Sequence, residues 1–416
     1  MKVVGIVAEY NPFHFGHKYH LEMSKKITDS EYAIAVMSGS FVQRGEPSLV
    51  DKWTKAKMAI DNGVDLVIEL PFIFATQSAE LFAYGSVALL NSLNIVDYIS
   101  FGSEEGKLDI LSEIAHVLIE EPPYYRESLK TYLKKGDSFS VSRQKALKDY
   151  CEKYKVKDIN LDAVLNSPNN ILAIEYLKAL IRLNSSITPV TIKRIGSHFK
   201  ETNLSNKISS ATAIRKKLLE DAESIDEIKD YVPHNTYVHL FKYLNSNNGF
   251  NSLHNYNQII HYLLRINCSK DLKDIIDIEP GLENRIIDMS SKERDLDSFI
   301  QSIVTKRYPR SRIQRILIHL MAGLKKSDLV DILPNYPSYI RVLGANEKGF
   351  KLLRKIKEKS DIPIITKFAD YKNFDSYYLE KTISYDKKAT DLFYLGINST
   401  PPFKDRDFYT TCYIKK

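Results

Sequence analysis

Residues 8 to 17 read Ala8-Glu9-Tyr10-Asn11-Pro12-Phe13-His14-Phe15-Gly16-His17. The apolar run that leads into this stretch predicts a buried strand, Val3 to Ala8, and the residues after it predict a helix that begins near His17. A helix start attracts phosphate through its open N–H groups and its positive dipole end, and a glycine there lets the backbone approach the anion. The stretch therefore predicts a phosphate-binding turn between a strand and a helix.

The first 100 residues alternate short apolar runs with longer amphipathic runs. The short runs predict strands at Val3 to Ala8, Tyr32 to Met37, Leu66 to Leu70 and Tyr98 to Phe101. The longer runs predict helices at His17 to Lys26, Lys52 to Asn62 and Ser78 to Asn91, with Gly63 as a C-terminal cap. Strands that are nearly all apolar are buried on both faces, which is typical of a parallel sheet covered by helices. The predicted fold class is α/β, with a Rossmann-like N-terminal unit.

The α/β pattern continues to about residue 230 and then fades. A Lys- and Glu-rich helical region at Leu108 to Tyr154 precedes a helix at Ile171 to Leu183, which the residues Ser167-Pro168-Asn169-Asn170 introduce. The β-branched run Thr188 to Ile195 predicts a fifth strand, and Ser209 to Leu219 predicts the helix after it. Further helices are predicted at Tyr256 to Ile266, Leu282 to Met289, Ser311 to Leu324 and Lys348 to Lys357. We therefore predict two domains, residues 1–230 with the parallel sheet and residues 231–416 mainly α-helical.

Composition narrows the class of protein. A hydrophobic share of 44% with 27% charged residues is ordinary for a folded soluble protein, and no run is long and apolar enough to cross a bilayer. Cys151, Cys268 and Cys412 lie too far apart for a Cys-x-x-Cys pair, and three cysteines cannot form a full disulfide framework. These features predict a cytoplasmic protein. The net charge of +7 by itself supports nucleic-acid binding only weakly.

His14 and His17 are the predicted catalytic residues. Because they are three positions apart, both rings can face one phosphate and donate hydrogen bonds to charge that builds on the α-phosphate and on departing pyrophosphate. The alternative is a pair of ordinary turn histidines at a helix start. A metal site is not predicted, because no third ligand lies nearby at a matching spacing.

The second candidate feature is Ile208-Ser209-Ser210-Ala211-Thr212-Ala213-Ile214-Arg215. A Ser or Thr at a helix start can be a structural N-cap and nothing more. Together with the first turn, however, these hydroxyls and the Arg215 guanidinium predict a second helix start that holds the β- and γ-phosphates from the other side of a cleft.

Several further motifs carry a family resemblance over the whole chain. They are Met37-Ser38-Gly39-Ser40-Phe41-Val42-Gln43-Arg44-Gly45-Glu46-Pro47, Asp65-Leu66-Val67-Ile68-Glu69-Leu70-Pro71, Phe101-Gly102-Ser103-Glu104, Asn170-Ile171-Leu172 and Lys193-Arg194-Ile195-Gly196. With residues 8–17 they resemble the His-x-Gly-His nucleotidyltransferase superfamily and, within it, the bacterial tRNA(Met) cytidine acetate ligase family. Ala8 to Pro12 replace the usual Gly-Thr-Phe-Asp-Pro, which separates the chain from the coenzyme-making members. Ser209 and Ala211 depart from the usual Ile-Ser-Ser-Thr-x-Ile-Arg.

This resemblance implies a two-step reaction. Acetate attacks the α-phosphate of ATP to give acetyl-adenylate, and the acetyl group passes to N4 of the wobble cytidine, C34, of elongator tRNA(Met), giving N4-acetylcytidine. ATP is then a substrate accompanied by Mg²⁺, the partners are acetate and the tRNA, and neither a membrane nor DNA is expected. The implied ATP-binding residues are Val7, Ala8, Glu9, Tyr10, Asn11, Pro12, Phe13, His14, Phe15, Gly16, His17, Lys18, Tyr19, His20, Gly102, Asn170, Arg194, Ser210, Thr212 and Arg215.

The predicted helical domain contains the best candidate for an RNA contact, Lys306 to Arg315. Basic residues there surround one aromatic residue without any acid, so that arginines could pair with phosphates while Tyr308 stacks on an unpaired base. A solvated helix face is the alternative. The predicted tRNA-binding residues are Lys306, Arg307, Tyr308, Arg310, Arg312 and Arg315. A weaker basic cluster is formed by Lys351, Arg354, Lys355 and Lys357.

The segment Gly39 to Gly45 is a further hypothesis. Two glycines flank polar residues directly after a strand, which suggests a flexible loop over the active site with Gln43 and Arg44 facing the substrate.

Two other functions remain open at this point. An adenylyltransferase that joins AMP to a small phosphorylated cofactor precursor would use the same histidines, although such an enzyme needs little more than the α/β unit. A non-catalytic RNA-binding protein with a relict nucleotide fold is the other, and the intact His14, Gly16 and His17 speak against it. A requirement for acetate in pyrophosphate release would separate these functions. The residues alone identify neither the acid, nor the modified nucleotide, nor a general base for acetyl transfer, nor the oligomeric state.

Overall fold

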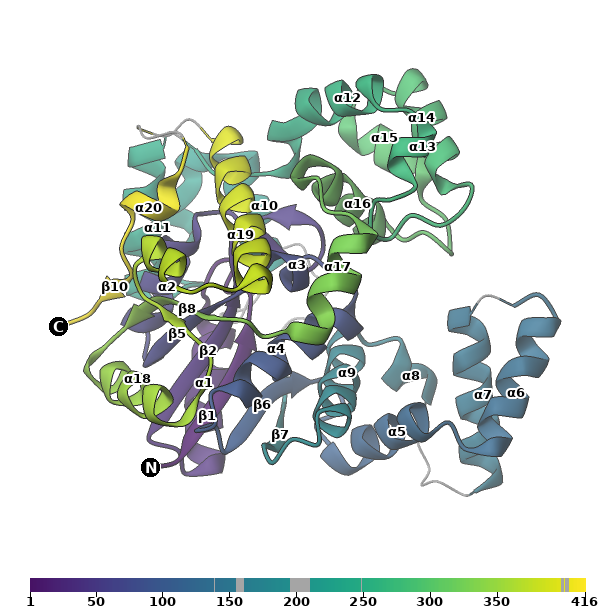
Figure 1. The fold of residues 1–416 in the computed structure, drawn as a ribbon, viewed down its shortest axis with the longest axis horizontal. Helices are drawn as coiled ribbons and strands as arrows, with labels where there is room; N and C mark the ends of the chain where they lie inside the picture. Colours follow the sequence, from purple (N-terminus) through teal and green to yellow (C-terminus); the bar gives the residue numbers. More distant parts are fainter. Residues whose placement is uncertain (138, 155–160, 195–209, 248, 398–399, 401–403) are drawn as a thin grey trace.

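The computed structural model describes residues 1–137, 139–154, 161–194, 210–247, 249–397, 400 and 404–416 (Figure 1). Its centre is a sheet in which the strand order is β10-β8-β5-β2-β1-β6-β7, with β9 paired to β8. Five strands run parallel: β1 (Val3–Ala8), β2 (Tyr32–Ser38), β5 (Leu66–Leu70), β6 (Tyr98–Ser103) and β7 (Thr188–Lys193). The α/β class and the five predicted strands are confirmed, although Ile195, the predicted end of the fifth strand, lies outside the described residues.

Helices cover both faces of this sheet, and as a result nearly every residue of β2 and β5 is buried. The helices predicted one by one in the first half are α1 (Phe15–Thr28), α2 (Lys52–Asp61), α4 (Ala79–Ser92), α9 (Pro168–Arg182) and the helix after the fifth strand, α10 (Ala211–Glu220); the region predicted to be helical at Leu108 to Tyr154 contains α5 (Leu108–Glu120), α6 (Pro123–Lys134) and α7 (Phe139–Lys153). Asp51 and Ser78 cap α2 and α4 by accepting backbone N–H groups of the first turn. The remaining elements of this half are α3 (Phe72–Ala75), α8 (Leu161–Leu165), β3 (Phe41–Val42) and β4 (Glu46–Pro47).

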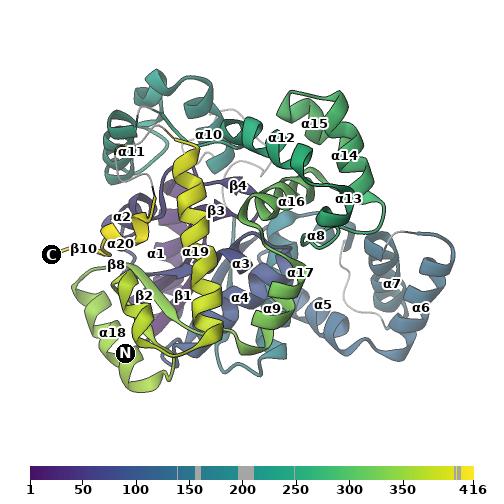
Figure 2. The same ribbon diagram turned by 45° about the horizontal axis from the view of Figure 1, so that its top comes forward.

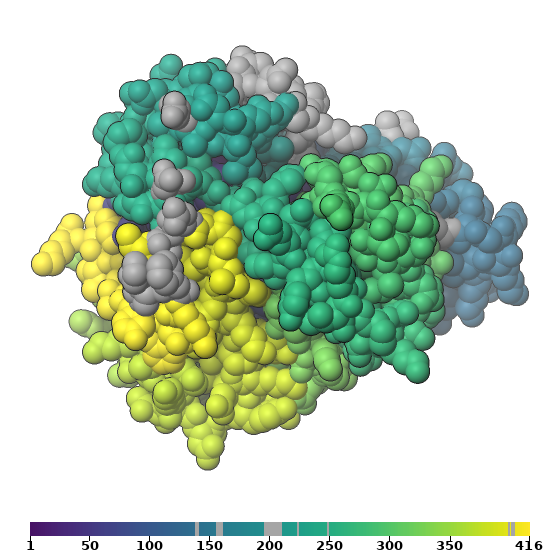
Figure 3. Space-filling model, turned by 90° about the horizontal axis from the view of Figure 1, so that it is seen from above, coloured from purple at the N-terminus to yellow at the C-terminus, as the bar shows by residue number. Residues whose placement is uncertain are grey.

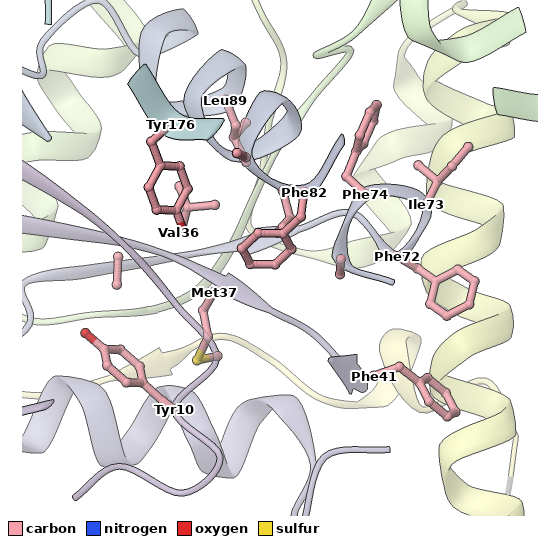
Figure 4. Close-up of a cluster of buried hydrophobic side chains, with 14 of the residues drawn as sticks. Tyr10, Val36, Met37, Phe41, Phe72, Ile73, Phe74, Phe82, Leu89 and Tyr176 are labelled. Carbon is pink, nitrogen blue, oxygen red and sulfur yellow. The ribbon is translucent and has the colours of Figure 1, made fainter. Parts of the chain in front are cut away.

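The core beside the carboxyl end of β2 brings together side chains from several elements (Figure 4). Met37 of β2, Tyr10, Phe82 of α4 and Tyr176 of α9 are each at most 3% exposed. The carboxyl end of β2 therefore stands on a closely packed aromatic base.

Residues 231–416 are mainly helical, as expected, but they also extend the sheet. Strand β8 (Ile340–Ala345) pairs antiparallel with β5, and β9 (Ile364–Ile365) and β10 (Tyr413–Ile414) pair parallel with β8. The expectation of a sheet made only of parallel strands within residues 1–230 is thus corrected. The physical reason is that β5 would otherwise be the edge of the parallel sheet, with backbone N–H and C=O groups left unpaired along an apolar strand. Strand β8 pairs with these groups and buries β5. The helices of this half are α11 (His234–Asn247), α12 (Asn257–Ile266), α13 (Ser269–Leu272), α14 (Leu282–Lys292), α15 (Leu296–Ile303), α16 (Arg310–Ala322), α17 (Lys326–Ile332), α18 (Glu347–Lys359), α19 (Tyr377–Leu395) and α20 (Arg406–Tyr409).

A buried ion cluster joins the two halves of the chain. The Lys52 ammonium lies 2.9 Å from Glu69 Oε1 and 2.8 Å from Asp407 Oδ1, and Arg341 Nη2 donates to Asp407 Oδ1 at 2.9 Å. Burial, together with Glu69, raises the pKa of the neighbouring Asp386 well above its ordinary value. Breaking one partner of such a group is costly, because it leaves a buried charge uncompensated. The C-terminal strands and helices are therefore part of the same folded body as β5.

None of the described helices combines the length and the apolar character that crossing a membrane requires.

Candidate nucleotide site

The first turn of α1 holds both predicted catalytic histidines. His14 is the N-cap residue, and its Nδ1 accepts a hydrogen bond from the Gly16 N–H at 3.0 Å. The His14 N–H in turn donates to His17 Nδ1 at 3.2 Å, and the two rings stack with centroids 3.7 Å apart. Since Nδ1 of each ring is an acceptor, the proton of each neutral ring lies on Nε2. The backbone of the turn thereby sets the tautomer of both imidazoles.

The histidines of α1 are uncharged at neutral pH. Burial first, and then the nearby Arg194 and Arg215, lower the pKa of His14 to about 3. The pKa of His17 is also held well below its ordinary value, by burial first and then by His14 and Arg194. Burial and Arg194 lower the pKa of His20 to about 4. The site thus offers oriented N–H donors on neutral imidazole rings.

The residues between β1 and α1 brace this turn. Tyr10 has a positive φ of 46°, and its ring contacts Phe13 and the edge of the His17 ring at centroid distances of 4.8 and 5.1 Å. Asn11 Oδ1 accepts the Leu49 N–H at 2.7 Å. These contacts leave the strand-to-helix turn little freedom, which suits a site that must hold a phosphate in one position.

The second predicted phosphate helix, α10, reaches the same turn. Ser210 caps α10 by accepting the Ala213 N–H at 3.1 Å, so it has at least the structural role of an N-cap. Arg215, one turn inside, donates through Nη1 to the Asn11 carbonyl at 2.9 Å. The predicted start of this helix at Ser209 lies outside the described residues, as do Ile195 and Gly196.

The carboxyl ends of β6 and β7 form the opposite wall. A Cβ atom on Gly102 would lie 3.2 Å from Arg194 Cγ, so the absence of a side chain on Gly102 leaves room for the arginine. Asn170, at the start of α9, accepts the N–H groups of Glu104 and Glu105 at 2.9 and 3.0 Å. Glu104 Oε2 accepts the Asn170 N–H in return, at 2.9 Å. Asn170 therefore holds the loop after β6 in place, and Glu104 is a site residue that the sequence prediction did not include.

Lys55 is a second residue that the sequence prediction left out of the site. Its side chain on α2 is fully buried, and its Nζ donates to the carbonyls of Ser38 at 2.8 Å and Glu9 at 3.3 Å. Burial lowers its pKa to about 7 against the opposing effect of Glu9. Lys55 thus ties the carboxyl ends of β1 and β2 together. A lysine on the apolar face of an amphipathic helix, beside Trp53 and Ala56, is the sequence signal that could have found it.

The segment Gly39 to Gly45 is a packed hairpin and not the flexible loop that we expected. Strands β3 and β4 pair antiparallel, and a Cβ atom on Gly45 would lie 2.3 Å from the backbone nitrogen of Arg315 in α16. The Gln43 N–H donates to Glu9 Oε1 at 2.9 Å, and Arg44 is largely buried with a pKa lowered by that burial. Close packing against α16 and hydrogen bonding to Glu9 keep this segment in one place.

The predicted tRNA-binding residues lie at and before the start of α16, and acids from other segments pair with their arginines. Arg307 Nε donates to Glu279 at 2.9 Å, and Arg312 Nη2 donates to the same carboxylate at 2.9 Å. Arg310 pairs with Asp297. Arg315 is nearly buried and donates to Asp277 at 2.8 Å. The guanidinium groups of Arg307 and Arg312 lie 5.6 and 5.3 Å from the ring centroid of Tyr308.

Two helix starts and the carboxyl ends of β1, β6 and β7 therefore meet at one edge of the sheet, with neutral imidazoles and two guanidinium groups around them. Open parallel sheets bind ligands at this edge. The arrangement defines a nucleotidyltransferase site, and a model of the family described as HIGH Nucleotidyl Transferase matches residues 1–407.

Comparison with known proteins narrows this class. The chain is 46% identical over 400 residues to a tRNA(Met) cytidine acetate ligase of Thermoanaerobacter sp., which covers 96% of each chain. It is 43% identical over 415 residues to the enzyme of that name from Clostridium botulinum, covering 100% of this chain and 99% of the relative. The crystal structure of Thermotoga maritima TmcAL bound with alpha-thio ATP covers all of both chains with a TM-score of 0.92 and 33% identity. The chain belongs to the HIGH nucleotidyltransferase family and, within it, to the family of tRNA(Met) cytidine acetate ligases.

Proposed function

We propose that the protein is an ATP-dependent ligase that acetylates N4 of the wobble cytidine, C34, of elongator tRNA(Met). In the first step an acetate oxygen attacks the α-phosphorus of ATP, the bond to the β-phosphate breaks, and pyrophosphate leaves. In the second step the cytidine amino nitrogen attacks the acetyl carbon, AMP leaves, and the amino group gives up a proton. Relatives with 43–46% identity carry the name of this activity, and a 33% identical structure was solved with an ATP analogue.

The neutral, oriented imidazoles of His14 and His17 carry this proposal. Charge develops on the α-phosphate and on pyrophosphate in the first step, and an Nε2–H donor that is already oriented stabilises that charge without reorganising. Arg215, Thr212 and Ser210 are assigned to the β- and γ-phosphates, and Arg194 and Gly102 to the nucleotide on the β6–β7 side. All of these residues belong to the predicted ATP-binding set, together with residues 7–20 and Asn170.

The proposal also assigns a place to Mg²⁺ and a cellular location to the reaction. Within the described residues no three His, Cys, Asp or Glu side chains come together as metal ligands, so the proposal gives Mg²⁺ no site on the protein and assigns it to the phosphates of ATP. We place the reaction in the cytoplasm because its RNA substrate is found there.

Pyrophosphate release from ATP tests the proposal. The purified protein is assayed with and without acetate, and with and without tRNA, beside His17→Ala and the control His116→Ala, which alters an exposed histidine of α5. We expect acetate-dependent release, a loss of about 100- to 1,000-fold in His17→Ala because one phosphate donor is removed, and no change in the control. Labelled acetate should then appear in the tRNA.

Each alternative function has its own signature in this assay. Pyrophosphate release that needs a phosphorylated acceptor in place of acetate would establish an adenylyltransferase. A protein that binds tRNA but releases no pyrophosphate under any condition would be the non-catalytic RNA-binding protein. Equal activity of His17→Ala and the unaltered protein would contradict the role given to the imidazole.

A further inference from the structure

Helices α6 and α7 form a hairpin at the edge of the molecule (Figures 1 and 2). Each helix has the other as its main packing partner, and α7 also contacts α8. Tyr125, Leu129, Ala146 and Leu147 of the hairpin are buried, and they continue the main hydrophobic core of the molecule. We call residues 123–153 the basic arm. In the space-filling view from above, the arm forms the rim of the molecule beyond the C-terminal half (Figure 3).

The arm carries a large share of the positive charge of the protein. Residues 123–153 contain eight Lys or Arg residues and four Asp or Glu residues, a net charge of +4 against +7 for the whole chain. Three of these eight cations pair with carboxylates, Arg126 with Glu121, Arg143 with Glu175 and Lys145 with Asp137. The attraction of the arm for a polyanion therefore depends on its other cations.

Two lysines of α6 form no ion pair with any carboxylate that the structure describes. Lys130 and Lys134 are both exposed and four positions apart, so they lie on one face of α6. Neither has an ion-pair partner among the residues that the structure describes. Asp149 of α7 accepts hydrogen bonds from the hydroxyl groups of Ser128 and of Tyr132, the latter at 3.2 Å.

Aromatic rings orient other lysines of the arm. Lys153 Nζ lies 3.7 Å from the ring centroid of Tyr124, and the ammonium groups of Lys135 and Lys145 lie 5.4 and 5.2 Å from that of Tyr132. A ring attracts a cation through its quadrupole but has no net charge, so the charge of the lysine remains available to a phosphate. Lys145 additionally pairs with Asp137 at 2.7 Å.

The arm is inserted into the chain between two residues of the nucleotide site. Glu104 precedes it and Asn170 follows it, and these residues bond to each other at the wall formed by β6 and α9. Helix α8, which contacts α7, ends a few residues before the start of α9. An RNA held by the arm is therefore attached to the segment that forms one wall of the nucleotide site.

We propose that the basic arm binds the phosphate backbone of the tRNA and presents the RNA to the nucleotide site, with Lys130 and Lys134 as phosphate contacts. This inference rests on the proposed function, since the RNA is the second substrate of that reaction.

The test neutralises two charges on the arm and two on a comparable helix elsewhere. Lys130→Gln/Lys134→Gln removes the α6 pair. Lys351→Gln/Arg354→Gln removes two exposed cations one turn apart on α18, a helix that packs on β2, β5 and β8; neither of them forms an ion pair among the described residues, whereas Lys355 pairs with Glu358. Affinity for elongator tRNA(Met) is measured over a series of salt concentrations. We expect the arm variant to bind about tenfold more weakly at 0.1 M salt, and the slope of log K against log salt to become shallower by about 1.5, as for the loss of two phosphate contacts.

Kinetic measurements separate this proposal from the proposed function. Acetate-dependent pyrophosphate release without RNA reports on the nucleotide site, and acetyl transfer should show a raised KM for tRNA with little change in kcat in the arm variant. If the arm variant binds tRNA with the same salt slope as the unaltered protein, or if the α18 pair lowers affinity equally, the arm proposal is overturned while the ligase activity stands. A protein that releases pyrophosphate but binds no tRNA would overturn the arm proposal and the second step of the reaction together.

Discussion

The basic arm and the segment Lys306–Arg315 differ in how folding affects their charge. The arginines of the segment pair with carboxylates from other parts of the chain, whereas Lys130 and Lys134 of the arm do not pair with any described carboxylate. The segment has five basic residues and no acid in ten positions, whereas the arm intersperses its cations with four acids. In the structure, Glu279 binds Arg307 and Arg312, Asp297 binds Arg310, and Asp277 binds Arg315. On the arm, Lys130 and Lys134 lack such partners among the described residues.

The contrast teaches that charge counted along a chain is not the charge that a ligand meets. The acids that neutralise the segment lie about 13 to 38 positions before its arginines, so no local pattern shows them. RNA contact by Lys306–Arg315 stays a prediction, but its arginines must exchange a carboxylate for a phosphate, which reduces the net gain. We therefore expect a smaller contribution to RNA affinity from the segment than from the arm.

The largest expected effect concerns packing, because Arg315 at one end of the segment is buried against the hairpin β3–β4, whereas the tip of the arm at Gly136 has open space around it. Gly45→Ala would place a Cβ atom 2.3 Å from the backbone nitrogen of Arg315, at a backbone φ of 75° that disfavours any side chain. We expect the free energy of unfolding to fall by about 2 to 4 kcal/mol. Urea unfolding can be followed by the fluorescence of Trp53, the single tryptophan, which is 3% exposed.

Gly136→Ala is the matched control, because Gly136 at the tip of the arm has a φ of 88° but nothing within 4 Å of the added carbon. Backbone strain alone should cost about 1 kcal/mol there. Equal losses in the two variants would mean that the hairpin β3–β4 does not pack on α16 as described.

Removing an acid should make the segment behave more like the arm. Glu279→Gln takes a carboxylate from both Arg307 and Arg312 and leaves the two guanidinium groups available to phosphate. We expect the affinity for tRNA to rise about two- to fivefold at 0.1 M salt, with a steeper salt dependence. A lower or unchanged affinity would contradict the role of Glu279 as a competitor of phosphate, and would remove the segment from the RNA surface.

Arg310→Gln should have the smallest effect. Arg310 and its partner Asp297 are both about half exposed, and exposed ion pairs contribute about 0–1 kcal/mol. We expect a change in tRNA affinity of less than about twofold in a filter-binding assay. A loss of affinity as large as that of Lys130→Gln/Lys134→Gln would mean that the segment contributes as much to tRNA binding as the arm, which contradicts the expected difference between them.

Local sequence determined the framework of the nucleotide site. The alternation of apolar and amphipathic runs predicted β1, β2, β5 and β6, because a strand buried on both faces must be apolar along its whole length. The β-branched run from Thr188 predicted β7, which is only partly buried. The turn from Ala8 to His17 likewise predicted where α1 begins, since the N-cap and the residues that it bonds lie within three positions. Neighbouring residues settle such features by themselves, and a sequence displays them directly.

The tertiary structure decided what depends on residues far apart in the chain. Strand β8 is recognisable only beside β5, because Arg341 interrupts its apolar run and finds its partner at Asp407. The low pKa of His14 requires burial together with Arg194 and Arg215, which come from two other elements. The charge available at the surface is also decided by the tertiary structure, because burial and ion pairing depend on residues that are close in space and not in sequence. The sequence by itself thus determined the chemistry available at each position, and only folding decided which charges remain available and which side chains meet.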